Sequence, residues 1–190
     1  VKINFLNADA NAITKGDDAL SDYSNYFIGN DKQKWATHVE SYRKVEYQNI
    51  YPSINLKVYS ETNNVKYDFI LNSGATVASI KMQINGAEAL YLKDNNLVLK
   101  TCVGNVVQEK PFAYQMINGT LQKVACEFTL NKNVIGFKLT KSYNKNFPLI
   151  IDPTLVFSTF TGSTVDNWGM SATYDEFGNA YTSGIAFGVG

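Results

Sequence analysis

The middle of the chain alternates between apolar and polar positions. In VKYDFIL, residues 65–71, every second residue from Val65 is apolar or aromatic, whereas Lys66 and Asp68 fall on the opposite face. A period of two is typical of a strand that buries one face. Similar stretches follow one another between residues 55 and 139, namely NLKVYS, SIKMQI, ALYL, LVLKT, NVVQ, PFAYQMI, LQKVACEFTL and VIGFKL.

Turn signals separate these stretches about every 8–15 residues, a spacing typical of a β-sandwich or barrel. They include Asn85-Gly86, Asp94-Asn95-Asn96 and Asn118-Gly119. Asn-Gly between two alternating stretches is a strong hairpin signal, because both residues tolerate a positive φ. We therefore predict an all-β fold, with a sandwich-like antiparallel domain over residues 1–152.

Three segments depart from this pattern. Residues 7–25 are small and polar, which predicts a loop. Residues 35–51, WATHVESYRKVEYQNIY, are the best helical candidate, although a strand and a turn fit them as well. The run FPLIIDPTLVFSTF is broken by Asp152-Pro153, and proline disfavours a central strand position. We expect a strand, a bend and a new strand over Leu155–Phe160, with the domain boundary near Ile151–Leu155.

The amino-acid composition limits the classes of partner and environment that can be expected for this chain. The 17 basic and 17 acidic residues give a net charge of zero, which offers no electrostatic reason to expect nucleic acid or an anionic membrane as partner. No apolar stretch approaches the roughly 20 residues of a membrane-spanning helix. Aromatic residues make up 13% of the chain, which favours strands. Cys102 and Cys126 fit either two buried thiols or, in an exported protein, one disulfide.

The end of the chain resembles a known repeat. TLVFSTFTGSTVDNWGMSATYDEFGNAYTSG, residues 154–184, is similar to one unit of the bacterial seven-bladed β-propeller (SBBP-type) repeat. Thr161 and Ser183 depart from that pattern, in which glycine and threonine are usual. The residues that fit its turn motif are Asp175, Gly178, Asn179, Ala180, Tyr181 and Gly184.

The preceding segment resembles the uncharacterised domain found before such repeats in secreted bacterial proteins. Four motifs in order carry this resemblance across residues 24–153, namely SNYFIGNDKQKW, YRKVEYQNIYPSINLKVY, VKYDFIL and PLIIDP. The resemblance implies a bacterial, secreted or cell-surface protein in which residues 153–190 form a first, incomplete propeller repeat. A single repeat cannot bury its own faces. We therefore expect that this chain is a fragment, truncated at both ends.

Catalytic signals are few. His38 is the only histidine, and the chain has no G-x-S-x-G motif, so a surface or loop histidine is favoured over a catalytic one. Zinc would require His38, Cys102, Cys126 and a carboxylate to converge, without a C-x-x-C motif. The pairs Asp17-Asp18 and Asp175-Glu176 are interpreted as solvated. Asp68 interrupts an apolar strand, and we interpret it as facing solvent or capping a turn.

Cofactors and ligands are equally weakly indicated. Residues 16–22 and 163–167 are rich in oxygen atoms, but they lack the spacing of a calcium-binding loop, so calcium is a minority alternative to no cofactor. Exposed aromatic rings stack on sugars, but aromatic residues more often pack in a core. We favour core positions for most of the aromatic run Trp35, Tyr42, Tyr47, Tyr51 and Tyr59.

These observations give a class of function rather than an activity. We expect a non-enzymatic module that serves adhesion or acts as a scaffold beside a β-propeller, with no assigned catalytic, cofactor or metal residue. Glycans or surface proteins are the expected partners, along with the downstream propeller of the same chain. The alternative is part of an extracellular carbohydrate-active enzyme, with its site in the missing propeller or at a domain interface.

Overall fold

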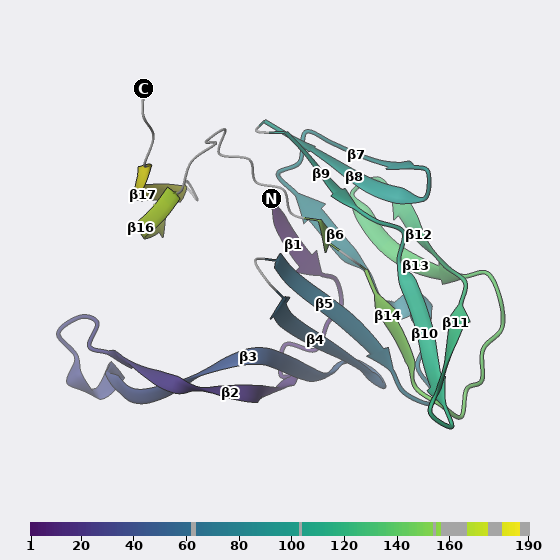
Figure 1. Cartoon of the computed structure of the whole chain (residues 1–190), viewed down its shortest axis with the longest axis horizontal. Coiled ribbons are helices and arrows are strands. Elements are labelled where there is room, and N and C mark those ends of the chain that lie inside the picture. Colours follow the sequence, from purple (N-terminus) through teal and green to yellow (C-terminus); the bar gives the residue numbers. More distant parts are fainter. Residues whose placement is uncertain (62–63, 103, 154, 157–166, 175–179, 187–190) are drawn as a thin grey trace. The chain divides into compact units, whose positions relative to one another are not determined.

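The computed structural model describes residues 1–61, 64–102, 104–153, 155–156, 167–174 and 180–186. The described residues form antiparallel β-sheets, which confirms the all-β prediction (Figure 1). The chain divides into two compact units, Val1–Phe157 and Ser158–Gly190. The first unit contains three sheets, and the second contains one hairpin.

The largest sheet has seven strands in the order β11-β10-β14-β5-β4-β3-β2. Strands β2 to β5 are consecutive hairpin neighbours, and β14 inserts between β5 and β10. The bounds of these strands are β2 Ile13–Tyr26, β3 Ala36–Tyr51, β4 Ile54–Glu61, β5 Asn64–Leu71, β10 Phe112–Ile117, β11 Thr120–Val124 and β14 Leu149–Asp152.

Two four-stranded sheets complete the first unit. One has the order β1-β6-β13-β12, and the other has the order β15-β9-β8-β7. Their bounds are β1 Lys2–Phe5, β6 Met82–Asn85, β12 Cys126–Asn131, β13 Val134–Leu139, β7 Ala89–Lys93, β8 Asn96–Thr101, β9 Gly104–Gln108 and β15 Leu155–Val156.

A single hydrophobic core joins the three sheets of this unit. The ring of Phe69 on β5 lies 5.8 Å from that of Phe137 on β13, so the seven-stranded sheet packs against the β1-β6-β13-β12 sheet as in a sandwich. Leu97 on β8 brings the third sheet into the same core. Tyr67, Phe69 and Leu71 face this core, which confirms the alternation predicted for residues 65–71.

Two of the predicted hairpin turns are present, whereas Asn85-Gly86 connects β6 to β7, which lie in different sheets and do not form a hairpin. Asn118 and Gly119 have φ values of 50° and 79° and connect the paired residues Ile117 and Thr120. Asp94 and Asn95 also have positive φ and connect β7 to β8. Two consecutive left-handed residues match the right-handed twist of the flanking strands, which explains why Asn, Asp and Gly occupy these positions.

One prediction for the N-terminal part is wrong: most of the segment predicted as a loop, residues 7–25, belongs to strand β2. Residues 35–51, for which a helix and a strand were both considered, form strand β3 and so agree with the strand alternative. Most β2 side chains are exposed on both faces. A strand that buries neither face needs no apolar alternation, so the sequence pattern carries no strand signal there.

Near the end of the chain, β14 and β15 are the two strands predicted on either side of Asp152-Pro153; residues 157–160 lie outside the described part. In the second unit, β16 (Asn167–Tyr174) pairs antiparallel with β17 (Ala180–Ala186). Of the repeat-turn residues, Ala180, Tyr181 and Gly184 lie in β17. Asp175, Gly178 and Asn179 lie outside the described residues.

Helical structure within the described ranges is limited to two 3-10 turns, η1 at Lys32–Lys34 and η2 at Val77–Ser79. No helix in this described part has the length and apolar character required to cross a bilayer.

Candidate functional site

The hairpin of β2 and β3 extends beyond the seven-stranded sheet. Strand β3 pairs with β4 only from Lys44 to Tyr51, whereas its pairing with β2 continues outward to Ala36. Residues 18–43, which we call the arm, therefore form a two-stranded ribbon and its connecting loop (Figure 1). At its base, Lys44 Nζ lies 3.5 Å from the Asp18 carboxylate.

The arm concentrates exposed apolar side chains. Of 14 exposed large hydrophobic residues in the described part of the chain, eight lie between residues 13 and 47, and six of these belong to the arm. Scattered exposed apolar residues are ordinary, but a local concentration of them marks an interaction surface. The eight residues are Ile13, Tyr23, Tyr26, Phe27, Ile28, Val39, Tyr42 and Tyr47.

Four arm residues form a continuous line on one face, which we call the aromatic row: Tyr42, Glu40, Tyr23 and His38. Tyr42 and Glu40 are two residues apart on β3, and the Tyr42 hydroxyl donates a hydrogen bond to the Glu40 carboxylate. Tyr23 lies opposite Glu40 in the strand register. Its ring centroid is 4.3 Å from that of His38. Tyr23 is 53% exposed and Tyr42 is 40% exposed, so solvent reaches both rings.

Local contacts hold the row in place. A Cβ atom at Gly16 would lie 2.6 Å from ring atoms of Tyr42, so this ring rests directly on the glycine backbone. At the other end, the His38 backbone N–H donates to Asn25 Oδ1 at 2.8 Å. His38 has a φ of 55°, a left-handed conformation that is uncommon for residues other than glycine. These contacts order the row in the absence of a third strand.

The electrostatics of the row are set by Glu40. Its hydrogen bond to the Tyr42 hydroxyl raises the pKa of Tyr42 above the usual value, so this phenol stays protonated and donates. The row contains no lysine or arginine. It therefore offers flat apolar ring faces beside hydroxyl, carboxylate and imidazole groups.

A second, smaller group of aromatic side chains lies at the end of the arm. The rings of Phe27 and Trp35 meet edge to face at 5.3 Å, and Lys32 Nζ lies 5.8 Å from the Trp35 ring centre. Trp35 Nε1 donates to the Gly29 carbonyl at 3.1 Å. Phe27 and the neighbouring Ile28 remain exposed. The end of the arm is thus locally ordered and apolar at its surface.

The structure corrects the interpretation of the aromatic run. Tyr51 alone among its five members is buried, while Tyr42 and Tyr47 are exposed and Trp35 and Tyr59 are half-buried. The prediction that most of them occupy the core is therefore wrong. His38 is an exposed residue, as the sequence interpretation favoured.

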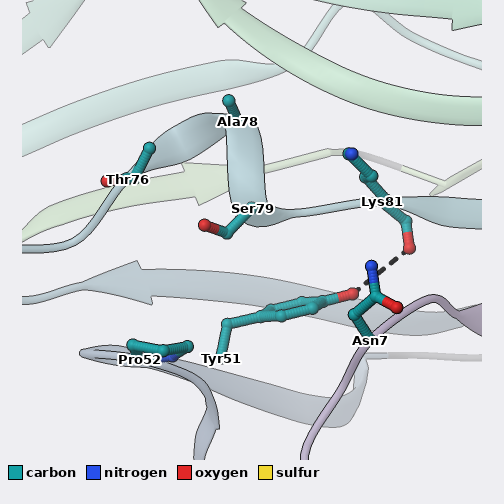
Figure 2. A pocket seen from close by; sticks show the side chains of 7 residues that line it. All are labelled: Asn7, Tyr51, Pro52, Thr76, Ala78, Ser79 and Lys81. Atoms are coloured by element: carbon teal, nitrogen blue, oxygen red, sulfur yellow. Dashed lines mark hydrogen bonds between the residues drawn. The ribbon is translucent and has the colours of Figure 1, made fainter.

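A hollow of about 380 Å³ lies on the sandwich, and none of its seven lining residues belongs to the arm (Figure 2). Tyr51, buried in its wall, donates through its hydroxyl to the Lys81 carbonyl at 3.2 Å. Hydroxyl and amide groups come from Asn7, Thr76 and Ser79, and Lys81 is the one ionisable group besides Tyr51 among the lining residues. A serine without a neighbouring histidine or carboxylate lacks the base that nucleophilic catalysis requires.

Asp68 differs from its predicted role as a solvent-facing residue or turn cap. It is half-buried on β5 and accepts a hydrogen bond from the Tyr59 hydroxyl at 3.3 Å. Asp68 precedes Phe69, and Asp152 follows its partner Ile151, so the antiparallel register makes the two aspartates neighbours. Burial, followed by the negative charge of Asp152, raises the pKa of Asp68 from 3.8 to about 6. Neither aspartate lines the hollow described above.

The remaining predicted residues do not form a site together. Cys102 is exposed next to the end of β8 and Cys126 is buried at the start of β12; both are free thiols, so the disulfide alternative is not formed. Asp17 and Asp18 lie at the base of the arm in ion pairs with Lys57 and Lys44.

No metal centre is visible among the residues that the structure describes, in which no three His, Cys, Asp or Glu side chains come close enough to hold an ion. Residues 16–22, the first oxygen-rich segment, belong to β2. Residues 163–166 of the second such segment and the pair Asp175-Glu176 lie outside the described part.

Sequence reasoning missed the aromatic row because its members come from segments predicted as a loop and as a helix or strand. The available signal was the density of tyrosine among small polar residues in SDYSNY and ESYRKVEY. Tyrosine, serine and asparagine together are also typical of antibody binding loops, where tyrosine supplies rigid contact area.

Comparison with known proteins identifies a family for most of the chain. Residues 1–154 match a family model described as a domain of unknown function, DUF7948. No curated protein and no solved structure matches the chain.

Proposed function

We propose that this chain, which belongs to the DUF7948 family, is a non-enzymatic binding module of a secreted or cell-surface bacterial protein. The module serves adhesion beside a β-propeller whose first repeat begins in residues 153–190. The observation that carries the proposal is the arm, with exposed aromatic rings on a ribbon that adds nothing to the hydrophobic core of the described residues.

Three features support a binding role. Tyrosine, tryptophan and arginine dominate the energetics of binding surfaces, and the arm contains Tyr23, Tyr42, Trp35 and Arg43. Its ring contacts and backbone hydrogen bonds order these side chains in advance, which lowers the entropy lost on binding. The resemblance of residues 154–184 to a propeller repeat and of residues 24–153 to the domain that precedes it supports export and the neighbouring propeller.

The direct test is removal of the arm. Asp17 and Lys44 are paired in the strand register, so residues 18–43 can be replaced by an Asn-Gly turn that closes the shortened hairpin. The intact chain, the shortened chain and a longer protein with a complete propeller are screened against glycans and matrix proteins. We expect the intact chain to bind and the shortened chain to lose binding with an unchanged unfolding temperature.

Two results would contradict this proposal. Equal binding by the intact and shortened chains would remove the arm from recognition. Binding only by the longer protein would make this domain a structural scaffold and would place recognition in the propeller.

A second candidate function rests on Asp68 and Asp152. One step beyond the paired Phe69 and Ile151, the antiparallel register brings Asp68 and Asp152 together, and glycosidases act on the glycosidic bond with two such neighbouring carboxyl groups. The raised pKa of Asp68, about 6, matches a general acid. In this alternative the chain is part of an extracellular carbohydrate-active enzyme; release of reducing sugar by the wild type but not by Asp68→Asn would favour it.

A further inference from the structure

We infer that the aromatic row binds a neutral polysaccharide, with sugar rings stacked on Tyr42 and Tyr23. This inference rests on the proposed function and specifies the ligand class. The first step is the exposed pair of rings: Tyr23 and Tyr42 lie on the same face of the arm as Glu40, one opposite it and one two residues along β3. Because Tyr42 is two residues from the strand partner of Tyr23 and on the same face, both rings can contact one extended chain.

The second step is the polar group between the rings. The Glu40 carboxylate has more acceptor sites than its hydrogen bond from Tyr42 uses, because each carboxylate oxygen carries two lone pairs. Sugar hydroxyls donate to such acceptors while the C–H face of the sugar rests on an aromatic ring. Rings that flank an acceptor suit a hydroxyl-rich ligand with apolar faces better than an apolar protein surface, because an apolar surface would bury the charged carboxylate with most of its acceptor sites unfilled.

The third step is charge. Residues 18–43 contain four acidic residues and three basic residues, and the carboxylate of Glu40 lies in the row itself. An anionic polysaccharide would place its carboxylates or sulfates beside Glu40, where like charges repel. The same balance gives no attraction for nucleic acid, whose affinity depends on clustered lysine and arginine. The charge distribution therefore selects a neutral ligand.

The fourth step is the rigidity of the row. Tyr42 rests on Gly16, and the ring of Tyr23 rests on His38, whose backbone is held by Asn25. Side chains that are already ordered lose little conformational entropy when a ligand arrives. The left-handed φ of His38 costs conformational free energy, and the surrounding contacts hold the residue in this strained conformation. Strained backbone of this kind is common at ligand sites.

The test measures binding of the whole 190-residue chain to soluble polysaccharides by affinity electrophoresis and calorimetry. The probes are three neutral polymers, a β-glucan, a mannan and a galactan, and one acidic polymer, alginate. Tyr23→Ala and Tyr42→Ala are each expected to weaken binding of a neutral polymer about tenfold. Tyr23→Phe keeps the ring and is expected to retain affinity within about twofold.

Tyr91→Ala is the matched control, because Tyr91 lies on β7, outside the arm, and its 39% exposure equals that of Tyr42 within one per cent. It should bind as the wild type does. Glu40→Gln removes the charge but keeps an acceptor, so it should preserve binding of the neutral polymer and reduce discrimination against alginate. Thermal unfolding of each variant confirms that the sandwich is intact.

Four results would overturn the inference. These are no binding of any neutral polymer, preferential binding of alginate, equal losses in Tyr91→Ala and Tyr23→Ala, and self-association through the arm that masks the row. The proposed function is tested separately: arm-dependent binding to a matrix protein without polysaccharide binding would refute the ligand class and leave the binding module standing.

Discussion

The sandwich and the arm are both antiparallel β-structure, but different forces order them. In the sandwich, Phe69, Leu71 and Ile151 have exposures at or near zero, and burial of their side chains stabilises the sheets. In the arm, strands β2 and β3 have no third strand and most side chains are exposed. A two-stranded ribbon alone is marginally stable in water, so ring stacking and local hydrogen bonds matter more there. The comparison separates residues whose burial stabilises the fold from residues whose exposed side chains are available for binding.

The largest expected effect is on the sandwich side of this comparison. Phe69→Ala removes a fully buried ring that contacts Phe5, Tyr67 and Phe137, and should lower the free energy of unfolding by about 3–5 kcal/mol. The arm substitution Tyr42→Ala should change it by less than about 1 kcal/mol. Urea denaturation measures both. Similar losses in the two variants would show that the arm is part of the cooperative fold.

The next largest effect on the free energy of unfolding is expected at Gln115, a buried polar residue that holds the segment before β14. Gln115 is 2% exposed; its Nε2 donates to the carbonyls of Asn144 and Phe147, and its Oε1 accepts from the Asn144 N–H. Gln115→Leu leaves those backbone groups without their partner and should cost about 1–3 kcal/mol.

Hydrogen exchange at Asn144 should accelerate in Gln115→Leu as the segment before β14 loosens. The matched control is Gln122→Leu, because Gln122 is the exposed partner of Gln115 in the β10–β11 register. An unchanged exchange rate at Asn144 in Gln115→Leu would count against this role of Gln115.

Asp68 should give a pH-dependent effect of smaller size. Its pKa is raised from 3.8 to about 6 by burial and by Asp152, against the opposing influence of Tyr59, Lys57 and Lys66. The folded state then binds more protons than the unfolded state between these values. Its contribution to stability is therefore present below about pH 4 and is lost as the pH rises through about 6.

Asp68→Asn removes this titration. Its unfolding midpoint should change less between pH 4 and pH 6 than that of the wild type, as measured by thermal denaturation across this range. Parallel pH profiles for the two proteins would show that other groups account for the dependence.

The smallest expected change in stability is at Gly16. Gly16→Ala places a methyl group against the Tyr42 ring and should displace it, with a loss of stability below about 1 kcal/mol. The NMR signals of the Tyr42 ring should shift and binding through the row should weaken. In a Tyr42→Ala background the same glycine substitution should have no further effect on binding; an additive loss would mean that Gly16 acts by another route.

The difference between the two regions also explains which parts of the fold the sequence predicted. Alternation at residues 65–71 and the Asn118-Gly119 turn reflect burial and left-handed backbone, and both predictions are confirmed. Strand β2 was predicted as a loop because GDDALSDYSNY has no buried face and hence no period. Asp68 was misjudged because its neighbour Asp152 is 84 positions away along the chain, and only the β5–β14 pairing brings them together.

The candidate site was still harder to predict from sequence. The row combines Tyr23 with three residues of β3, and only the strand register places Tyr23 opposite Glu40. Bulges in the hairpin shift that register between Ala19 and Tyr23, so counting residues from the turn would not have found the pair. The Tyr42 ring packs on Gly16 of the neighbouring strand, and this cross-strand contact likewise has no local sequence signal.

The separation of the arm from the core has a consequence for how this family can diversify. In the described part of the chain, no residue between 18 and 43 belongs to the hydrophobic core or packs directly on it. Substitutions there, and changes in hairpin length, leave the packing of the sandwich untouched. Selection can therefore alter the exposed surface of the arm while the sandwich sequence stays nearly constant, as in variable loops on a conserved framework.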